Sequence, residues 1–89
     1  MARFELNAIG SNNFGGRSVS VDALFELGLM YACGREAEPD LVSAHKWFSL
    51  AAARGHIQAR DYRKEISQEM SRQEIASAHR LSREWLAKH

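Results

Sequence analysis

Apolar and polar residues follow a helical period through most of the chain. Over 21–33, apolar side chains recur at every fourth position in Ala23, Leu27 and Tyr31, which predicts an amphipathic helix. Gly34 favours the end of that helix, because glycine readily adopts the left-handed conformation of a C-cap. The same period returns three more times further along the chain.

The second helix is expected to begin at Asp40, which follows the only proline and can cap the helix, and to end at Gly55. A third helix fits residues 57–70. Ser71 and Glu74 form the pattern of a capping box, in which each side chain satisfies a free backbone amide, and this opens a fourth helix. Short connections predict that neighbouring helices run antiparallel.

Composition supports an all-α fold. Threonine is absent and valine plus isoleucine total seven, so residues that favour strands are few. Alanine, which favours helices, occurs thirteen times. A domain of 89 residues buries only about 60% of its unfolded surface. Burial against a partner or a second copy would therefore add stability.

Net charge, cysteine content and hydropathy exclude several classes of function. Twelve basic and eleven acidic side chains leave a net charge of +1, which removes the electrostatic case for nucleic acid or an anionic membrane surface. A single cysteine, Cys33, cannot form an internal disulfide, and no apolar run approaches a membrane span or a signal peptide. We therefore expect a cytoplasmic protein.

The two halves of the helical region match each other. Residues 43–47 align with 77–81 at an offset of 34, and Ala23 aligns with Ala59 at an offset of 36. A repeat of this length is typical of helical solenoids. The sequence thus predicts two antiparallel helix pairs, each a helix-turn-helix, stacked as a short α–α solenoid.

Residues 1–19 form a separate arm. Glycine and asparagine are frequent there, which favours irregular backbone. Apolar residues are nevertheless spaced along it, at Phe4, Leu6, Ile9 and Phe14. Two interpretations stay open: a disordered leader, or an extended strap whose apolar side chains dock on the helices.

The first helix pair carries a family pattern. Small residues, Gly28 and Ala44 among them, would let the two helices approach closely, with aromatic side chains filling the surrounding space. The pattern consists of Leu27-Gly28-x-x-Tyr31 on the first helix and Trp47-Phe48-x-x-Ala51-Ala52-x-x-Gly55-His56-x-x-Ala59 on and after the second. It resembles the Sel-one-like repeat family, which is related to the tetratricopeptide repeats, over about 22–59.

That resemblance implies a division into the arm at 1–19, one repeat at 20–55 and a degenerate capping helix pair at 56–89. In the second half, Lys64 and Ser67 stand where the family has glycine and tyrosine. The family binds proteins through the concave face formed by the first helix of each pair. On this chain that face would carry Asp22, Phe25, Leu29, Gln58, Asp61 and Glu65.

Catalytic or cofactor chemistry finds little support in the residues. His45 and His79 occupy equivalent positions on helices expected about 8–10 Å apart, too far for a shared metal ion without inward reach from both. We expect no catalytic, cofactor-binding or metal site. The arginines of the last two helices alternate with acids, as in Arg80 and Glu84, so surface pairing accounts for them and no nucleic acid is expected.

The resulting prediction is a protein–protein interaction module: a scaffold, adaptor or accessory subunit whose partner is unidentified. Two alternatives are a self-associating structural protein, which forms a homo-oligomer, and a subunit bound tightly to a larger enzyme complex. The arm carries Arg3 and Phe4, which complement an apolar and acidic groove. It could occupy that groove in its own chain or in a neighbouring copy.

Overall fold

A computed structural model describes residues 19–34 and 38–89 of the chain. These residues form four α-helices: α2 (Val21–Cys33), α3 (Leu41–Ala53), α4 (Ile57–Ser67) and α5 (Arg72–Lys88). No strand occurs within the described ranges, so the all-α prediction is confirmed. The predicted arm lies outside these residues except for Val19, which is buried.

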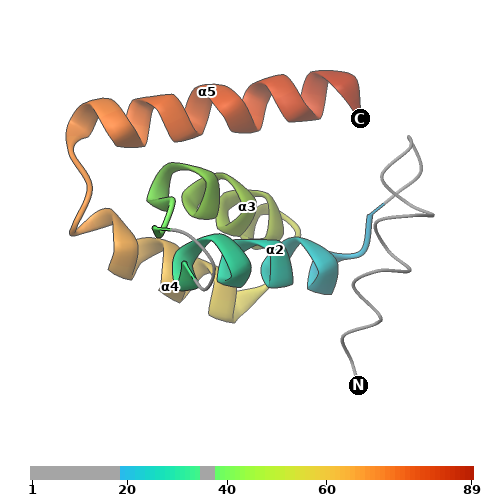
Figure 1. The fold of residues 1–89 in the computed structure, drawn as a ribbon. Helices are drawn as coiled ribbons and strands as arrows, with labels where there is room; N and C mark the ends of the chain where they lie inside the picture. Colours follow the sequence, from blue (N-terminus) through green and yellow to red (C-terminus); the bar gives the residue numbers. More distant parts are fainter. Residues whose placement is uncertain (1–18, 35–37) are drawn as a thin grey trace.

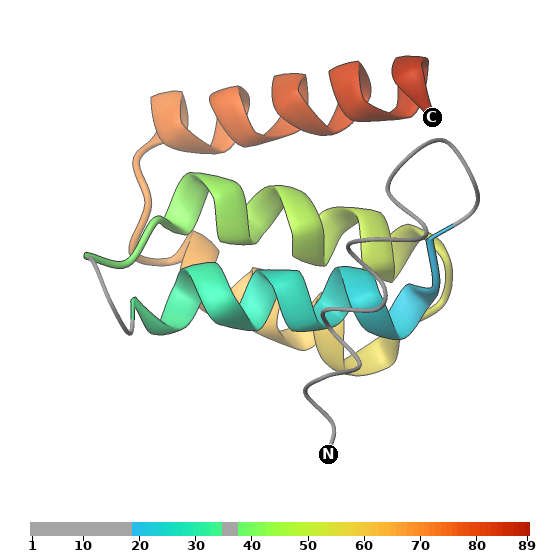
Figure 2. The same ribbon diagram turned by 45° about the vertical axis from the view of Figure 1, so that its right-hand side comes forward.

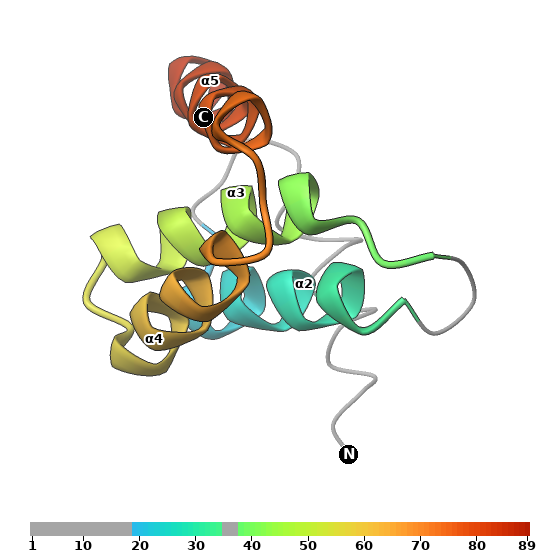
Figure 3. The ribbon, with the colours of Figure 1, turned by 90° about the vertical axis from the view of Figure 1, so that its left-hand side faces the viewer.

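Helix α3 lies at the centre and packs against each of the other three helices. Helices α2 and α4 lie on one side of α3, and α5 lies on the opposite side (Figures 1 and 3). Figure 2 shows α2, α3 and α5 as successive layers. This arrangement is consistent with two helix pairs stacked as a short solenoid.

Each helix begins with a side chain that accepts a hydrogen bond from the backbone amide three residues later. Asp40 and Ser71 were expected in this role, and both fill it. Ser20 caps α2 and His56 caps α4 in the same way, and neither was predicted. Because these bonds satisfy amides that have no partner inside the helix, they fix where each helix starts.

Helix α4 is shorter than the sequence suggested. It ends at Ser67 rather than Met70, because the next three backbone amides bond to carbonyls three residues back and tighten the chain into turns. These turns bring Met70 into a buried position before α5 begins.

The contact between α2 and α3 centres on Leu24 and Gly28, both of which are buried. A Cβ atom built at Gly28 would overlap the ring of Phe48, which is itself fully buried. The absence of a side chain at this position is therefore what allows the ring to lie against α2. The predicted packing of Tyr31 was wrong, since 41% of this residue is exposed near the end of the helix.

Replacing Ser71 with alanine is expected to lower the free energy of unfolding by about 1 kcal/mol. The reciprocal bonds between Ser71 and Glu74 measure 3.0 and 2.8 Å, and the substitution removes the first of them. Chemical denaturation measures the loss. Ser71→Asp, which keeps an acceptor at the cap, should retain most of the stability; equal losses in both variants would contradict the role of the cap.

Candidate functional site

The six residues predicted to bind a partner lie on α2 and α4, which share one side of α3 (Figure 3). We call this surface the α2–α4 face. Its four polar members, Asp22, Gln58, Asp61 and Glu65, are exposed. The two apolar members, Phe25 and Leu29, are partly buried and pack against the hydrophobic core.

The expectation that Phe25 stands off the packing stripe was wrong. Its ring stacks on the imidazole of His56 with centroids 4.2 Å apart, and it also contacts the rings of Tyr62 at 5.5 Å and Phe48 at 5.8 Å. Tyr62 of α4 and His56, the N-cap of α4, thus cover Phe25. Phe25 serves first as a packing residue between three helices.

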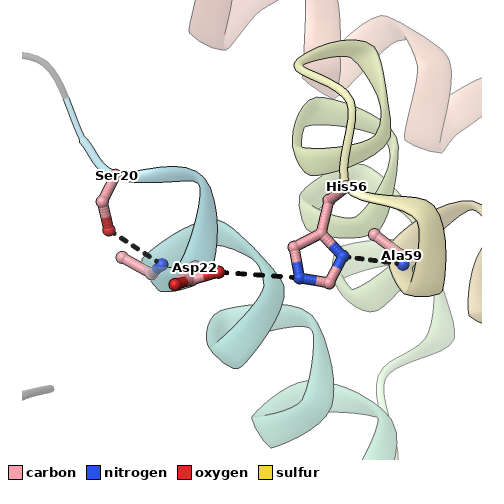
Figure 4. Close-up of polar contacts among 5 residues, drawn as sticks. Ser20, Asp22, His56 and Ala59 are labelled. Atoms are coloured by element: carbon pink, nitrogen blue, oxygen red, sulfur yellow. Dashed lines mark hydrogen bonds and ion pairs between the residues drawn. The ribbon is translucent and has the colours of Figure 1, made fainter.

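His56 connects the cap of α4 to the start of α2 (Figure 4). Its Nδ1 atom accepts a hydrogen bond of 3.1 Å from the amide of Ala59, so in this neutral ring the hydrogen is on Nε2. That atom lies 3.7 Å from Oδ1 of Asp22. His56 therefore caps the first turn of α4 and stacks on the ring of Phe25, and its Nε2 atom lies near the carboxylate of Asp22.

The contact between Asp22 and His56 is long, at 3.7 Å, and 92% of the Asp22 side chain is exposed. Its carboxylate is free to accept hydrogen bonds from an incoming group. The distance to His56 exceeds that of a direct hydrogen bond, so this contact neither fixes nor neutralises the carboxylate.

Tyr62 is the exposed aromatic residue of the α2–α4 face. Its ring meets Phe25 and Phe48 edge-on, yet 40% of the residue is accessible to solvent. The spacing of Ala59, Tyr62 and Ile66, at three and four residues, predicts that all three lie on the packing side of α4. Only the position of α2 relative to α4 reveals that one side of the ring is free, and no signal in the sequence fixes that position.

The charge of the α2–α4 face is negative. Helix α2 contains no basic residue, and its two acids, Asp22 and Glu26, are both exposed. Asp61 and Glu65 add two exposed carboxylates from α4. An exposed aromatic edge surrounded by carboxylates suits a partner that presents basic and apolar groups together.

A second polar cluster lies on α3, around the buried His45, of which 2% is exposed. Ser67 donates to the carbonyl of Arg63, so Nε2 of His45 donates to Oγ of Ser67 at 3.0 Å. Nδ1 then accepts from the hydroxyl of Ser49 at 3.4 Å. Both ring nitrogens are used, and the imidazole is neutral.

Burial, and then the positive charges of His79 and Arg63, lower the pKa of His45 to about 4. The rings of His45 and His79 lie 5.5 Å apart, closer than the helix spacing had suggested, because both side chains reach into the space between α3 and α5. Two histidines with a nearby arginine do not form a metal site. The described ranges hold no group of three or more His, Cys, Asp or Glu side chains placed to bind a metal ion.

Among the residues that the structure describes, Lys46 is the other one whose pKa is perturbed. Partial burial lowers the pKa of its amine, while Glu84 acts in the opposite direction, and Nζ lies 4.1 Å from the ring centroid of Trp47. The indole of Trp47 in turn meets that of Trp85 edge-on at 5.8 Å. These contacts join α3 to α5 and explain how the last helix is held to the rest of the domain.

Comparison with known proteins gave no match to a family model, to a curated protein or to a solved structure. Among the helices that the structure describes, none is long and apolar enough to cross a membrane.

Proposed function

We propose that this chain is a protein–protein interaction module of the Sel-one-like repeat type, which binds its partner at the α2–α4 face. The observation that carries the proposal is the combination of a half-exposed Tyr62 ring with surrounding free carboxylates. Aromatic side chains at the centre of a polar rim are the usual anchors of protein interfaces.

The structure of this face adds a preference for the partner. The carboxylates of Asp22, Asp61 and Glu65 are exposed, and none of them makes an ion pair with Lys or Arg in the described residues. A segment with lysine or arginine beside an apolar side chain would meet both the charge and the aromatic edge. Such charges mainly accelerate association and select the partner.

The arm of this chain has that chemistry in Arg3 and Phe4, but it lies outside the described residues. Self-association through the arm is therefore the second candidate function, and a permanent place in a larger enzyme complex is the third. Mass measurement of the purified chain separates them, because a defined homodimer without any partner supports self-association.

Reversing the charge of two carboxylates on the α2–α4 face is expected to abolish partner capture. We would use wild type, Asp61→Lys/Glu65→Lys and a control, Glu38→Lys, as bait in native-cell extract, with quantitative mass spectrometry of bound proteins. Glu38 is exposed but lies in the connection before α3. Wild type and control should enrich the same partner at least about tenfold over the double variant.

Equal recovery of every protein by all three baits would contradict the proposal. A Tyr62→Ala bait gives an independent reading, because loss of an aromatic anchor should weaken capture without changing the charge. Circular dichroism of each bait confirms that the helices are retained. Partner loss with Asp61→Lys/Glu65→Lys but not with Tyr62→Ala would mean that charge alone carries recognition.

A further inference from the structure

The basic side chains of α4 lie on one flank of the helix. Arg60, Arg63, Lys64 and Ser67 are spaced three and four residues apart, so they share one flank. Ser67 bonds to His45 of α3, which turns this flank away from α2. Of the two acids of α4 on the α2–α4 face, Glu65 lies on the opposite flank, whereas Asp61 also borders the basic flank.

Helix α5 places a further basic side chain, His79, beside His45. The ring of His79 lies next to that of His45, so the side of α5 that carries His79 borders the region occupied by Ser67. Arg83 is one turn beyond His79 and shares its side of the helix. We define the basic surface by the residues Arg60, Arg63, Lys64, His79 and Arg83.

These charges are not neutralised by the described parts of the chain. In the described residues only one Lys or Arg makes an ion pair, Arg80 with Glu84, so the expected pairing of the other arginines was wrong. The α4 part of the surface forms a shallow, open depression bordered by Arg60, Asp61, Arg63, Lys64 and Ser67. Burial, and after it the charges of His79 and Arg63, lowers the pKa of the neighbouring His45.

We propose that the basic surface binds a carboxylate-rich segment of a protein. Guanidinium groups match carboxylates in a paired geometry, and three of the five side chains are arginines. A nucleic acid fits less well, because the chain carries a net charge of only +1 and the basic surface includes no Phe, Tyr or Trp on which a base could stack. This second surface is distinct from the α2–α4 face, and its test does not depend on that proposal.

Fluorescence anisotropy of a labelled deca-glutamate peptide, titrated with the full-length chain at low salt, tests the proposal. We expect saturable binding that weakens as salt is added, because exposed charges are screened. Arg60→Glu/Arg83→Glu should weaken the affinity at least about tenfold. Arg60→Gln/Arg83→Gln, a milder change that removes charge without adding repulsion, should weaken it about threefold.

The matched control is Arg80→Glu/Lys88→Glu, which changes the net charge equally at two residues that do not belong to the basic surface; Arg80 is paired with Glu84. It should keep its affinity within about threefold of wild type. Failure of the wild type to bind deca-glutamate, or equal losses in the control, would overturn the proposal. Tighter binding of a ten-nucleotide single-stranded DNA than of deca-glutamate would also overturn it, because the surface would then serve nucleic acid.

Discussion

Replacing Gly28 with leucine is expected to lower the free energy of unfolding by roughly 3 kcal/mol, the upper end of the usual cost of overpacking. The ring of Phe48 occupies the space where any side chain at this position would begin, and it is fully buried. The ring cannot move without displacing Phe25 and Tyr62, which it contacts. Thermal unfolding should show a fall of about 12–24 °C in the melting temperature.

A smaller change separates the steric cause from other effects of the substitution. Gly28→Ala should also destabilise the chain, and Phe48→Leu in the same molecule should recover part of that loss, because the smaller side chain leaves room for the new methyl group. Glu26→Leu is the control, since it adds a leucine to an exposed position of α2. An unchanged melting temperature in Gly28→Leu would show that the two helices do not meet at this glycine.

The helices could be predicted from the sequence because their ends depend on local interactions. Asp40 and Ser71 start helices through bonds to amides three residues away, and Gly34 ends α2 with a positive φ of 63°. Such signals act within one turn of the chain. Gly28 was also readable as a point of close approach, but its neighbour is the ring of Phe48 rather than the alanines that flank it on α3.

The sequence predicted the functional surfaces less well, because these surfaces depend on how separate helices are placed relative to one another. The same residue, Phe25, can face a groove or fill an interface, and the position of α4 decides between them. The basic side chains of α4 follow a helical period in the sequence. The direction in which they face is fixed only by the hydrogen bond between Ser67 and His45. Alternating charges in the sequence had suggested mutual pairing, which the structure shows for Arg80 and Glu84.

Acidification from pH 6.5 to pH 4 is expected to remove as much as roughly 3 kcal/mol of stability through His45 alone. The folded chain lowers the pKa of this imidazole to about 4, whereas in the unfolded chain it lies near 6.5. Between these values the unfolded state binds the additional proton, so stability falls as the pH falls. Protonation would place a charge on Nδ1, which accepts from Ser49, and beside the positive charges of Arg63 and His79.

Urea denaturation at several pH values between 4 and 7 measures this effect by comparison with His45→Gln. The glutamine amide can still donate to Ser67 but does not titrate, so the variant should lose about 1 kcal/mol at pH 7 and decline less steeply in acid. The two stability curves should therefore converge or cross as the pH falls. His89→Gln, at the exposed end of α5, should keep the slope of wild type. A proton NMR titration with a midpoint near pH 6.5 for His45 would contradict the buried, neutral imidazole, because a ring with that pKa gains nothing by remaining uncharged in the fold.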